Sequence, residues 1–237
     1  SMTLRFHTQT AGCSLTAQQP EINIVRVAIQ AMAGVLGGTQ SLHTDSMDEA
    51  LALPSEKAVQ IALRTQQIIA HESGVANVAD PLGGSYYLEW LTDDMERQSR
   101  DYFDRIESLG GVVSAIEKGF FQKEIAAAAY KYQQEIDNNE RTVVGVNEFT
   151  SNEPVEIPIL EMDPEGFERQ CRRLKNLRSS RDKARHEASL TAIEKAAEGE
   201  ENLMPHFIEA AKAKATLGEM CDVLRGVFGE YREGSDF

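Results

Sequence analysis

The sequence predicts an α/β protein whose first part alternates strands with helices and whose remainder is mainly helical. Three observations carry this prediction. Residues 3–10 alternate in character and are rich in Thr and aromatic residues, which indicates a short strand. Apolar residues then recur at helical spacing over 22–36. A second strand and a second helix complete the order by residue 74, and this order with short loops is typical of a parallel sheet.

The first helix is expected over 22–36, where Gly37 and Gly38 stop it because glycine reaches the left-handed conformation without penalty. A strand is predicted over 39–44, and a helix runs from about 55 to 72, capped by Ser46 or Ser55. Two parallel strands cannot stand alone, so we expect them to belong to a larger sheet.

Most of the remaining chain has helical patterns. The expected elements, after a turn over 80–87, are a helix capped by Thr92 and ending near 109, helices near 112–118 and 121–138, a β segment over 142–149, an extended stretch over 155–160, and helices from 164 to 231 broken near Gly199 and Gly218.

Composition excludes several classes of partner. The 237 residues include 38 acidic and 24 basic side chains, a net charge of −14, which argues against nucleic acid and against an anionic membrane surface. No apolar run approaches the roughly 20 residues that span a bilayer. The three cysteines are far apart in the sequence, which favours a reducing, cytoplasmic location and gives no metal-ligand spacing.

The residue types alone assign no catalytic residue and no metal ligand. His43 and the acidic residues after it match no established ligand pattern. A triad of Ser41, His43 and Asp80 lacks a nucleophile elbow. His7 and His43 remain candidates because α/β folds place active-site residues at strand ends.

Long motifs add a resemblance to a known family. RFHTQTAGCSLT (5–16), GGTQSLHTDSMDEALALP (37–54), DPLGGSYY (80–87), TVVGVNEF (142–149) and LGEMCDVLRGVFGEY (217–231) resemble the catalytic chain of the coenzyme B12-dependent acyl-CoA mutases, among them methylmalonyl-CoA mutase. The resemblance covers nearly the whole chain.

The resemblance implies the C-terminal part of a (β/α)8 barrel that binds a CoA ester along its axis. Residues 1–92 would supply the last two β/α units, and residues 93–237 a mainly helical extension with a short β segment near 142–160. The family's substrate-binding residues would lie upstream, and its cobalt-ligating D-x-H-x-x-G motif has no match here. The implied partners are an N-terminal barrel half and a separate cobalamin-binding subunit. We expect the surface that faces the missing strands to be apolar.

The implied cofactor is adenosylcobalamin, with its cobalt ligand supplied by another domain or chain. By resemblance, the cofactor-binding residues are Gln9, Gly12, Glu49 and Ala52, and the possible site-lining residues are His7, Gln40 and His43. Several of them have a plainer alternative. His7 could be a satisfied histidine at a strand end. Gly12 could simply permit a turn, Glu49 could stabilise a helix start, and Gln40 could brace its loop, as could His43. Two residues depart from the family pattern: Cys13 stands where Trp is frequent, and Asp45 where Asn is usual.

The resemblance implies an isomerase, incomplete alone, that interconverts methylmalonyl-CoA and succinyl-CoA by a radical carbon-skeleton rearrangement. One alternative is a component of an isobutyryl-CoA or hydroxyisobutyryl-CoA mutase. The other is a non-catalytic module that assembles a mutase complex. Whether the chain is a natural subunit or a fragment stays open.

Overall fold

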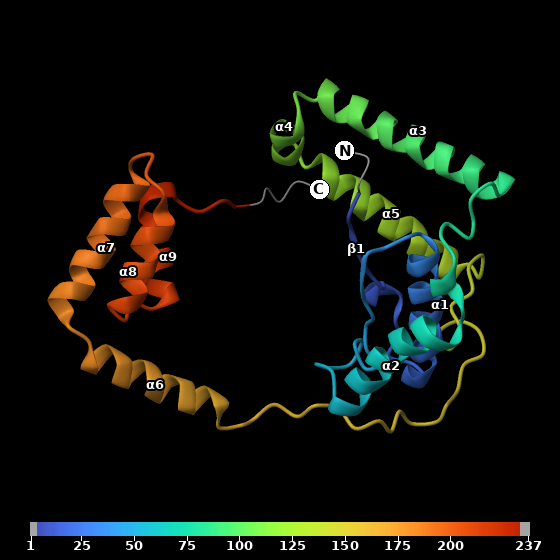
Figure 1. The fold of residues 1–237 in the computed structure, drawn as a ribbon, viewed down its shortest axis with the longest axis horizontal. Coiled ribbons are helices and arrows are strands. Elements are labelled where there is room, and N and C mark those ends of the chain that lie inside the picture. Colours follow the sequence, from blue (N-terminus) through green and yellow to red (C-terminus); the bar gives the residue numbers. More distant parts are fainter. Residues whose placement is uncertain (1–3, 233–237) are drawn as a thin grey trace. The chain divides into compact units, whose positions relative to one another are not determined.

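The computed structural model describes residues 4–232 and divides them into two compact units, which we call unit one (4–161) and unit two (162–232) (Figure 1). Unit one contains β1 (His7–Gln9), α1 (Asn23–Leu36), β2 (Ser41–His43), α2 (Glu56–Glu72), α3 (Tyr86–Ser108), α4 (Val112–Glu117) and α5 (Phe120–Asp137). Unit two contains α6 (Gly166–Ser180), α7 (Lys183–Ala197), α8 (Leu203–Lys212) and α9 (Leu217–Phe228). The described chain is thus a mostly helical α/β protein with a small parallel sheet. The assignment of residues 1–92 to barrel units stays a prediction.

The sheet consists of β1 and β2, which pair in parallel with His7 opposite Ser41 and Gln9 opposite His43. Helix α1 connects the two strands, as the predicted strand–helix–strand order requires. Both strands are shorter than predicted, with three residues each. The regular pairing ends where the loops leave the strands, although the Thr10 amide still donates to the His43 carbonyl.

One face of the sheet packs against α1. Thr8 and Leu42 point to this face, and α1 approaches them closely at Gly34. A Cβ atom at Gly34 would lie 3.1 Å from Thr8 Cγ2, so glycine there permits the close approach of helix and sheet. The crossover helix is therefore tightly seated on the sheet.

The opposite face of the sheet is polar. Because successive strand residues alternate between faces, the residues His7, Gln9, Ser41 and His43 share it, and all four are exposed. The expectation of an apolar surface is therefore wrong for this face of the strands. Hydrophobic burial is instead concentrated on the side covered by α1 and α2.

The core of unit one lies between α1, α2 and the loops that follow the strands. Its buried apolar residues are Leu15, Val27, Ala31, Met47, Ala58, Ala62 and Ile69. Small alanines on both helices let their backbones approach closely. Ser55 caps α2 by accepting a hydrogen bond from the Ala58 amide, and Ser46 lies in the preceding loop.

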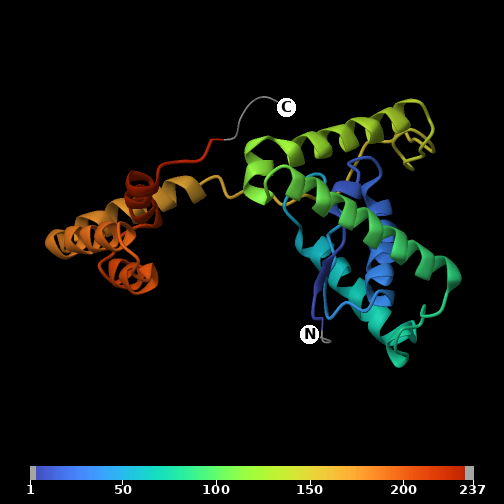
Figure 2. The same cartoon turned by 90° about the horizontal axis from the view of Figure 1, so that it is seen from above.

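Helix α3 begins earlier than predicted. Its N-cap is Ser85, so the expected cap Thr92 lies inside the helix, where its hydroxyl donates to the Leu88 carbonyl. The turn over 80–85 leads directly into the helix, and a Thr can satisfy its hydroxyl within a helix without ending it. Helix α4 joins α3 to α5 (Figure 2). Arg105 of α3 forms an ion pair with Glu124 of α5, with 2.5 Å between Nη2 and Oε1.

Residues 142–160 form a loop where a β segment was expected. Within the described residues of this stretch, the β structure is an isolated bridge between Val144 and Glu148. Gly145 adopts a positive φ of 83°, which reverses the chain between the two bridge residues. Arg26 of α1 donates to the Val144 carbonyl at 2.7 Å, so a side-chain contact holds the loop against α1.

Unit two is a cluster of helices in which α7 packs against α8 and α9 (Figure 1). Its buried residues include Ile193, Ala196 and Ala210. The predicted break near Gly199 is confirmed, but the expected break at Gly218 is wrong because Gly218 lies inside α9. Thr216 caps α9 in a reciprocal capping box with Glu219, which moves the break upstream. Within residues 4–232, no helix is long and apolar enough to cross a membrane.

Candidate functional site

The loops after β1 and β2 meet at one edge of the sheet, because the carboxyl ends of parallel strands lie together. We call the residues gathered there, Gln9, Gly12, His43, Asp45 and Glu49, the strand-end site. The structure thus brings together three of the four residues expected to bind the cofactor, together with one of the expected lining residues.

Asp45 ties the two strand ends together. Its side chain is 1% exposed. Oδ1 accepts a hydrogen bond from Gln9 Nε2 at 3.0 Å, and Oδ2 accepts one from Thr10 Oγ1 at 2.9 Å. The Asp45 amide donates in return to Thr10 Oγ1 at 2.9 Å. His43 Nε2 lies 3.5 Å from Asp45 Oδ1, with its side chain 56% exposed.

The backbone at Gly12 lies beside the Glu49 side chain. Its φ lies outside the left-handed region, so the backbone does not require glycine for a turn. A Cβ atom at Gly12 would lie 3.4 Å from Glu49 Oε1 and 3.8 Å from Asp45 Oδ2. The alternative that Gly12 merely permits a turn is therefore not supported, and the absence of a side chain keeps the Glu49 carboxylate accessible.

Glu49 lies in a turn, exposed, with its amide donating to the Ser46 carbonyl. The alternative that it stabilises a helix start is wrong, since α2 begins only at Glu56. Ala52 follows in the same loop and is half-buried, and its amide donates to the Asp48 carbonyl. Both residues are placed by a backbone turn rather than by a helix.

Asp48 anchors this loop to α2. It is fully buried, and its Oδ2 accepts a hydrogen bond from the Ser55 amide at 2.8 Å. Burial raises the pKa of Asp48. The hydrogen bonds that its carboxylate accepts, the strongest from the Ser55 backbone amide, outweigh that effect and hold the pKa below its ordinary value. Asp48 is thus a charged tether that sets the path of the chain past Glu49.

Asn23 is a positioning residue that the sequence patterns did not reveal. It is fully buried at the start of α1. Its Nδ2 donates to the carbonyls of Thr16 and Met47, each at 2.9 Å, and its Oδ1 accepts from the Thr16 amide at 3.1 Å. One side chain therefore joins the loop after β1 to the loop after β2. A polar residue inside an apolar helical pattern was the one available signal.

His7 and Gln40 lie at the opposite end of the strand pair. His7 shares the polar face with Gln9, and its Nδ1 is hydrogen-bonded to Ser41 Oγ. The side-chain oxygen Oε1 of Gln40 accepts a hydrogen bond from the Phe6 backbone amide at 2.8 Å, and its Nε2 donates to the Gly38 carbonyl at 2.7 Å. These contacts support the alternative that Gln40 braces its loop. The structure does not bring these two residues into the strand-end site. That His7 lines the ligand site and that Gln40 lines a substrate channel stay predictions.

The strand-end site presents exposed hydrogen-bonding groups that a polar ligand could contact. It offers an exposed carboxylate at Glu49, an exposed side-chain amide at Gln9 and a position without a side chain at Gly12. The carboxylate can accept hydrogen bonds, and the amide can both donate and accept them. Within residues 4–232, no three His, Cys, Asp or Glu side chains are grouped to hold a metal ion.

Comparison with known proteins gives consistent matches. The family model described as methylmalonyl-CoA mutase matches residues 1–230. The 2-hydroxyisobutanoyl-CoA mutase large subunit of Aquincola tertiaricarbonis is 48% identical over 98% of this chain and 42% of its own length. The mitochondrial methylmalonyl-CoA mutase of Homo sapiens is 44% identical over 98% of this chain and 31% of its own. The methylmalonyl-CoA mutase of Escherichia coli is 43% identical over 98% of this chain and 32% of its own length. The chain therefore spans less than half the length of these relatives.

Proposed function

The chain belongs to the methylmalonyl-CoA mutase family, and on that premise we propose that it forms the C-terminal part of an adenosylcobalamin-dependent acyl-CoA mutase. The proposed reaction interconverts methylmalonyl-CoA and succinyl-CoA by moving the carbonyl-CoA group between adjacent carbons. The proposed partners are an N-terminal barrel half and a cobalamin-binding subunit, since this chain spans 31–42% of the relatives compared above. The proposed location is the cytoplasm, in keeping with three free cysteines.

The polar face of the sheet is the observation that carries this proposal. Ordinary eight-stranded barrels fill their interior with layers of branched apolar side chains. Here the face turned away from α1 carries His7, Gln9, Ser41 and His43. A face of this kind suits a barrel whose interior holds a polar ligand rather than a packed core. The amide-containing chain of an acyl-CoA is a ligand of that chemistry.

The residues of the strand-end site would hold the cofactor. Glu49 would accept hydrogen bonds from ribose hydroxyls, and Gln9 would contribute its amide. Gly12 and Ala52 would let the corrin approach closely. Adenosylcobalamin, when bound, supplies the carbon-centred radical that starts the rearrangement. These side chains would orient the bound group and exclude water from it, without moving a proton.

A second substrate is favoured by one specific observation. The identity is higher to the large subunit named for 2-hydroxyisobutanoyl-CoA than to the methylmalonyl-CoA mutases. That name describes the same class of rearrangement on an acyl group that carries a hydroxyl. Because the substrate-selecting residues are implied to lie upstream, the two substrates have to be compared on the assembled protein.

The test is reconstitution. The chain is co-expressed with the N-terminal segment of a mutase relative and a cobalamin-binding chain, and turnover is measured with methylmalonyl-CoA and with 2-hydroxyisobutanoyl-CoA. We expect turnover that requires all three components, with the ratio of kcat/KM values assigning the substrate. Full turnover without this chain would contradict the proposal and favour a non-catalytic assembly role. Turnover by this chain alone would contradict the assignment of the catalytic groups to its partners.

A further inference from the structure

The orientation of the Gln9 amide is set by Asp45. A carboxylate accepts hydrogen bonds and cannot donate them, so both neighbours of Asp45 must present hydrogens to it. Gln9 therefore turns its NH2 group toward Asp45 Oδ1, at 3.0 Å. Its carbonyl oxygen Oε1 consequently points away from Asp45. Because Gln9 is exposed, that oxygen is available to a ligand.

Thr10 makes this arrangement directional. Its hydroxyl oxygen already accepts a hydrogen bond from the Asp45 amide at 2.9 Å. The hydroxyl hydrogen is therefore free to point at Asp45 Oδ2, also at 2.9 Å. An amide in place of the Asp45 carboxylate would keep its oxygen on Thr10 and place its NH2 group against Gln9. The Gln9 amide would then have to flip and present its own NH2 group outward.

We propose that Asp45 is a positioning residue that holds Gln9 with its carbonyl oxygen toward the ligand, so that this point of the strand-end site binds a hydrogen-bond donor. The ligand group of matching chemistry is a hydroxyl or an amide N–H. The identity of that ligand, cofactor or acyl-CoA, rests on the proposed function, whereas the orientation of Gln9 does not. His43 is the other titratable group that faces Asp45, and its Nε2 lies 3.5 Å from the oxygen that Gln9 shares.

The orientation is tested first in the full chain by itself. Hydrogen exchange of the Gln9 side-chain NH2 is measured by nuclear magnetic resonance in the wild type, in Asp45→Asn and in Asp48→Asn. Asp48→Asn is the matched control, because Asp48 is equally buried in the same loop but bonds to Ser55. We expect exchange of the Gln9 NH2 to accelerate about tenfold in Asp45→Asn, the size of one charge-assisted hydrogen bond, and to stay unchanged in Asp48→Asn. Equal exchange in all three proteins would overturn the proposal.

The second arm measures ligand binding in the reconstituted assembly. Adenosylcobalamin affinity, from absorbance titration, and the KM for acyl-CoA are compared in the wild type, Asp45→Asn, Gln9→Ala and the double variant. We expect Asp45→Asn to weaken one of the two by about tenfold when Gln9 is present and by less than twofold in the Gln9→Ala background. The same loss in both backgrounds would show that Asp45 does not act through Gln9.

Two controls separate the possible failures. Circular dichroism melting of each variant establishes that it is folded, and Gln9→Ala offers an exposed change that tests the same contact if Asp45→Asn melts early. A wild-type assembly that binds no cofactor and turns over no substrate would defeat the proposed function alone. The exchange measurement on the separate chain would then still decide the orientation of Gln9.

Discussion

Asp45 in unit one and Glu219 in unit two are both largely buried carboxylates that join distant segments, and their charges are stabilised in different ways. Glu219 receives both ends of the Arg181 guanidinium at 2.8 Å, together with the Thr216 amide and hydroxyl. Asp45 receives hydrogen bonds from neutral donors on Gln9 and Thr10. A carboxylate matched by a fixed cation is a structural lock. A carboxylate hydrogen-bonded to an exposed amide orients that amide, and so decides whether its oxygen or its NH2 group faces a ligand.

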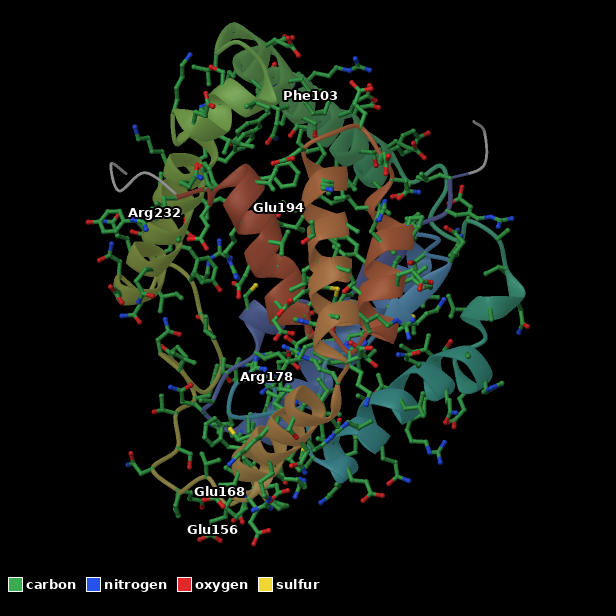
Figure 3. The ribbon with its side chains drawn as sticks, turned by 90° about the vertical axis from the view of Figure 1, so that its left-hand side faces the viewer. Phe103, Glu156, Glu168, Arg178, Glu194 and Arg232 are labelled. Atoms are coloured by element: carbon green, nitrogen blue, oxygen red, sulfur yellow. The ribbon has the colours of Figure 1, made fainter. Side chains whose placement is uncertain are left out.

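The surroundings of Glu219 sharpen the contrast. The side chains of Arg181 and Glu219 are 13% and 20% exposed, so water screens their pairing only partly. Arg178, labelled in Figure 3, adds its guanidinium at 3.6 Å from Glu219 Oε1. The hydrogen bonds from Arg181 hold the pKa of Glu219 far below its ordinary value, although burial opposes this. Glu219 therefore stays charged at any pH at which the protein is normally studied.

Breaking the Glu219 lock should have the largest effect. Arg181→Ala leaves Glu219 without its bidentate partner, and we expect unit two to lose roughly 2–4 kcal/mol in the free energy of unfolding. Urea unfolding followed by circular dichroism measures this loss. Arg225→Ala is the matched control: Arg225 pairs with Asp222 on the surface, so its removal should cost less than about 1 kcal/mol. Equal losses would show that the Glu219 pair is no stronger than a surface pair.

Removing Asn23, which joins the two loops of the strand-end site, should have the second largest effect on stability. Asn23→Ala leaves the Thr16 and Met47 carbonyls without their donor, and we expect unit one to lose about 2 kcal/mol. Hydrogen exchange should show both loops opening together. Opening of the loop after β1 alone would contradict the role of Asn23 as a link between the loops.

Acid should release the Glu219 lock gradually. Because the folded pKa is lowered from an ordinary value of 4.5, the stabilisation is fully present above about pH 5 and is lost as pH falls toward the folded pKa. We expect unit two to lose about 1 kcal/mol by pH 3.5, from one proton taken up on unfolding. The measurement compares urea midpoints at pH 7 and pH 3.5. In Glu219→Gln this share of the pH dependence should disappear, and its persistence would assign the effect to other groups.

The smallest effect on stability is expected at the strand-end site itself. In Gly12→Ala the added Cβ meets Glu49 at an ordinary contact distance, and the backbone φ suits alanine, so stability should change by less than about 0.5 kcal/mol. Adenosylcobalamin affinity of the reconstituted assembly should nevertheless fall, because the methyl group fills the space beside Glu49. A stable variant with unchanged affinity would remove Gly12 from the cofactor site.

Local patterns predicted the elements that depend on neighbouring residues. Helical spacing and terminal glycines placed the helix over 22–36 within one residue of α1 (Asn23–Leu36), and Ser55 was among the predicted caps of α2. The motifs around β1 and β2 identified the family. The same local reasoning misplaced the start of α3 and the break before α9. Helix α3 begins after Ser85, whose side chain makes no capping hydrogen bond, and Thr92 instead donates its hydroxyl to the Leu88 carbonyl inside the helix. At α9 the reciprocal contacts of Thr216 and Glu219 place the helix start before Gly218.

The strand-end site needed the tertiary structure. Gln9 and Asp45 are 36 residues apart, and they meet because β1 and β2 pair in parallel with Gln9 opposite His43. Asn23 joins two loops for the same reason, since its partners Thr16 and Met47 come together only when α1 crosses over the sheet. The sequence by itself determined which side chains were available, through composition, periodicity and motif. Which oxygen faces which hydrogen was decided by packing, because hydrogen bonds depend on distances and angles that sequence order does not set.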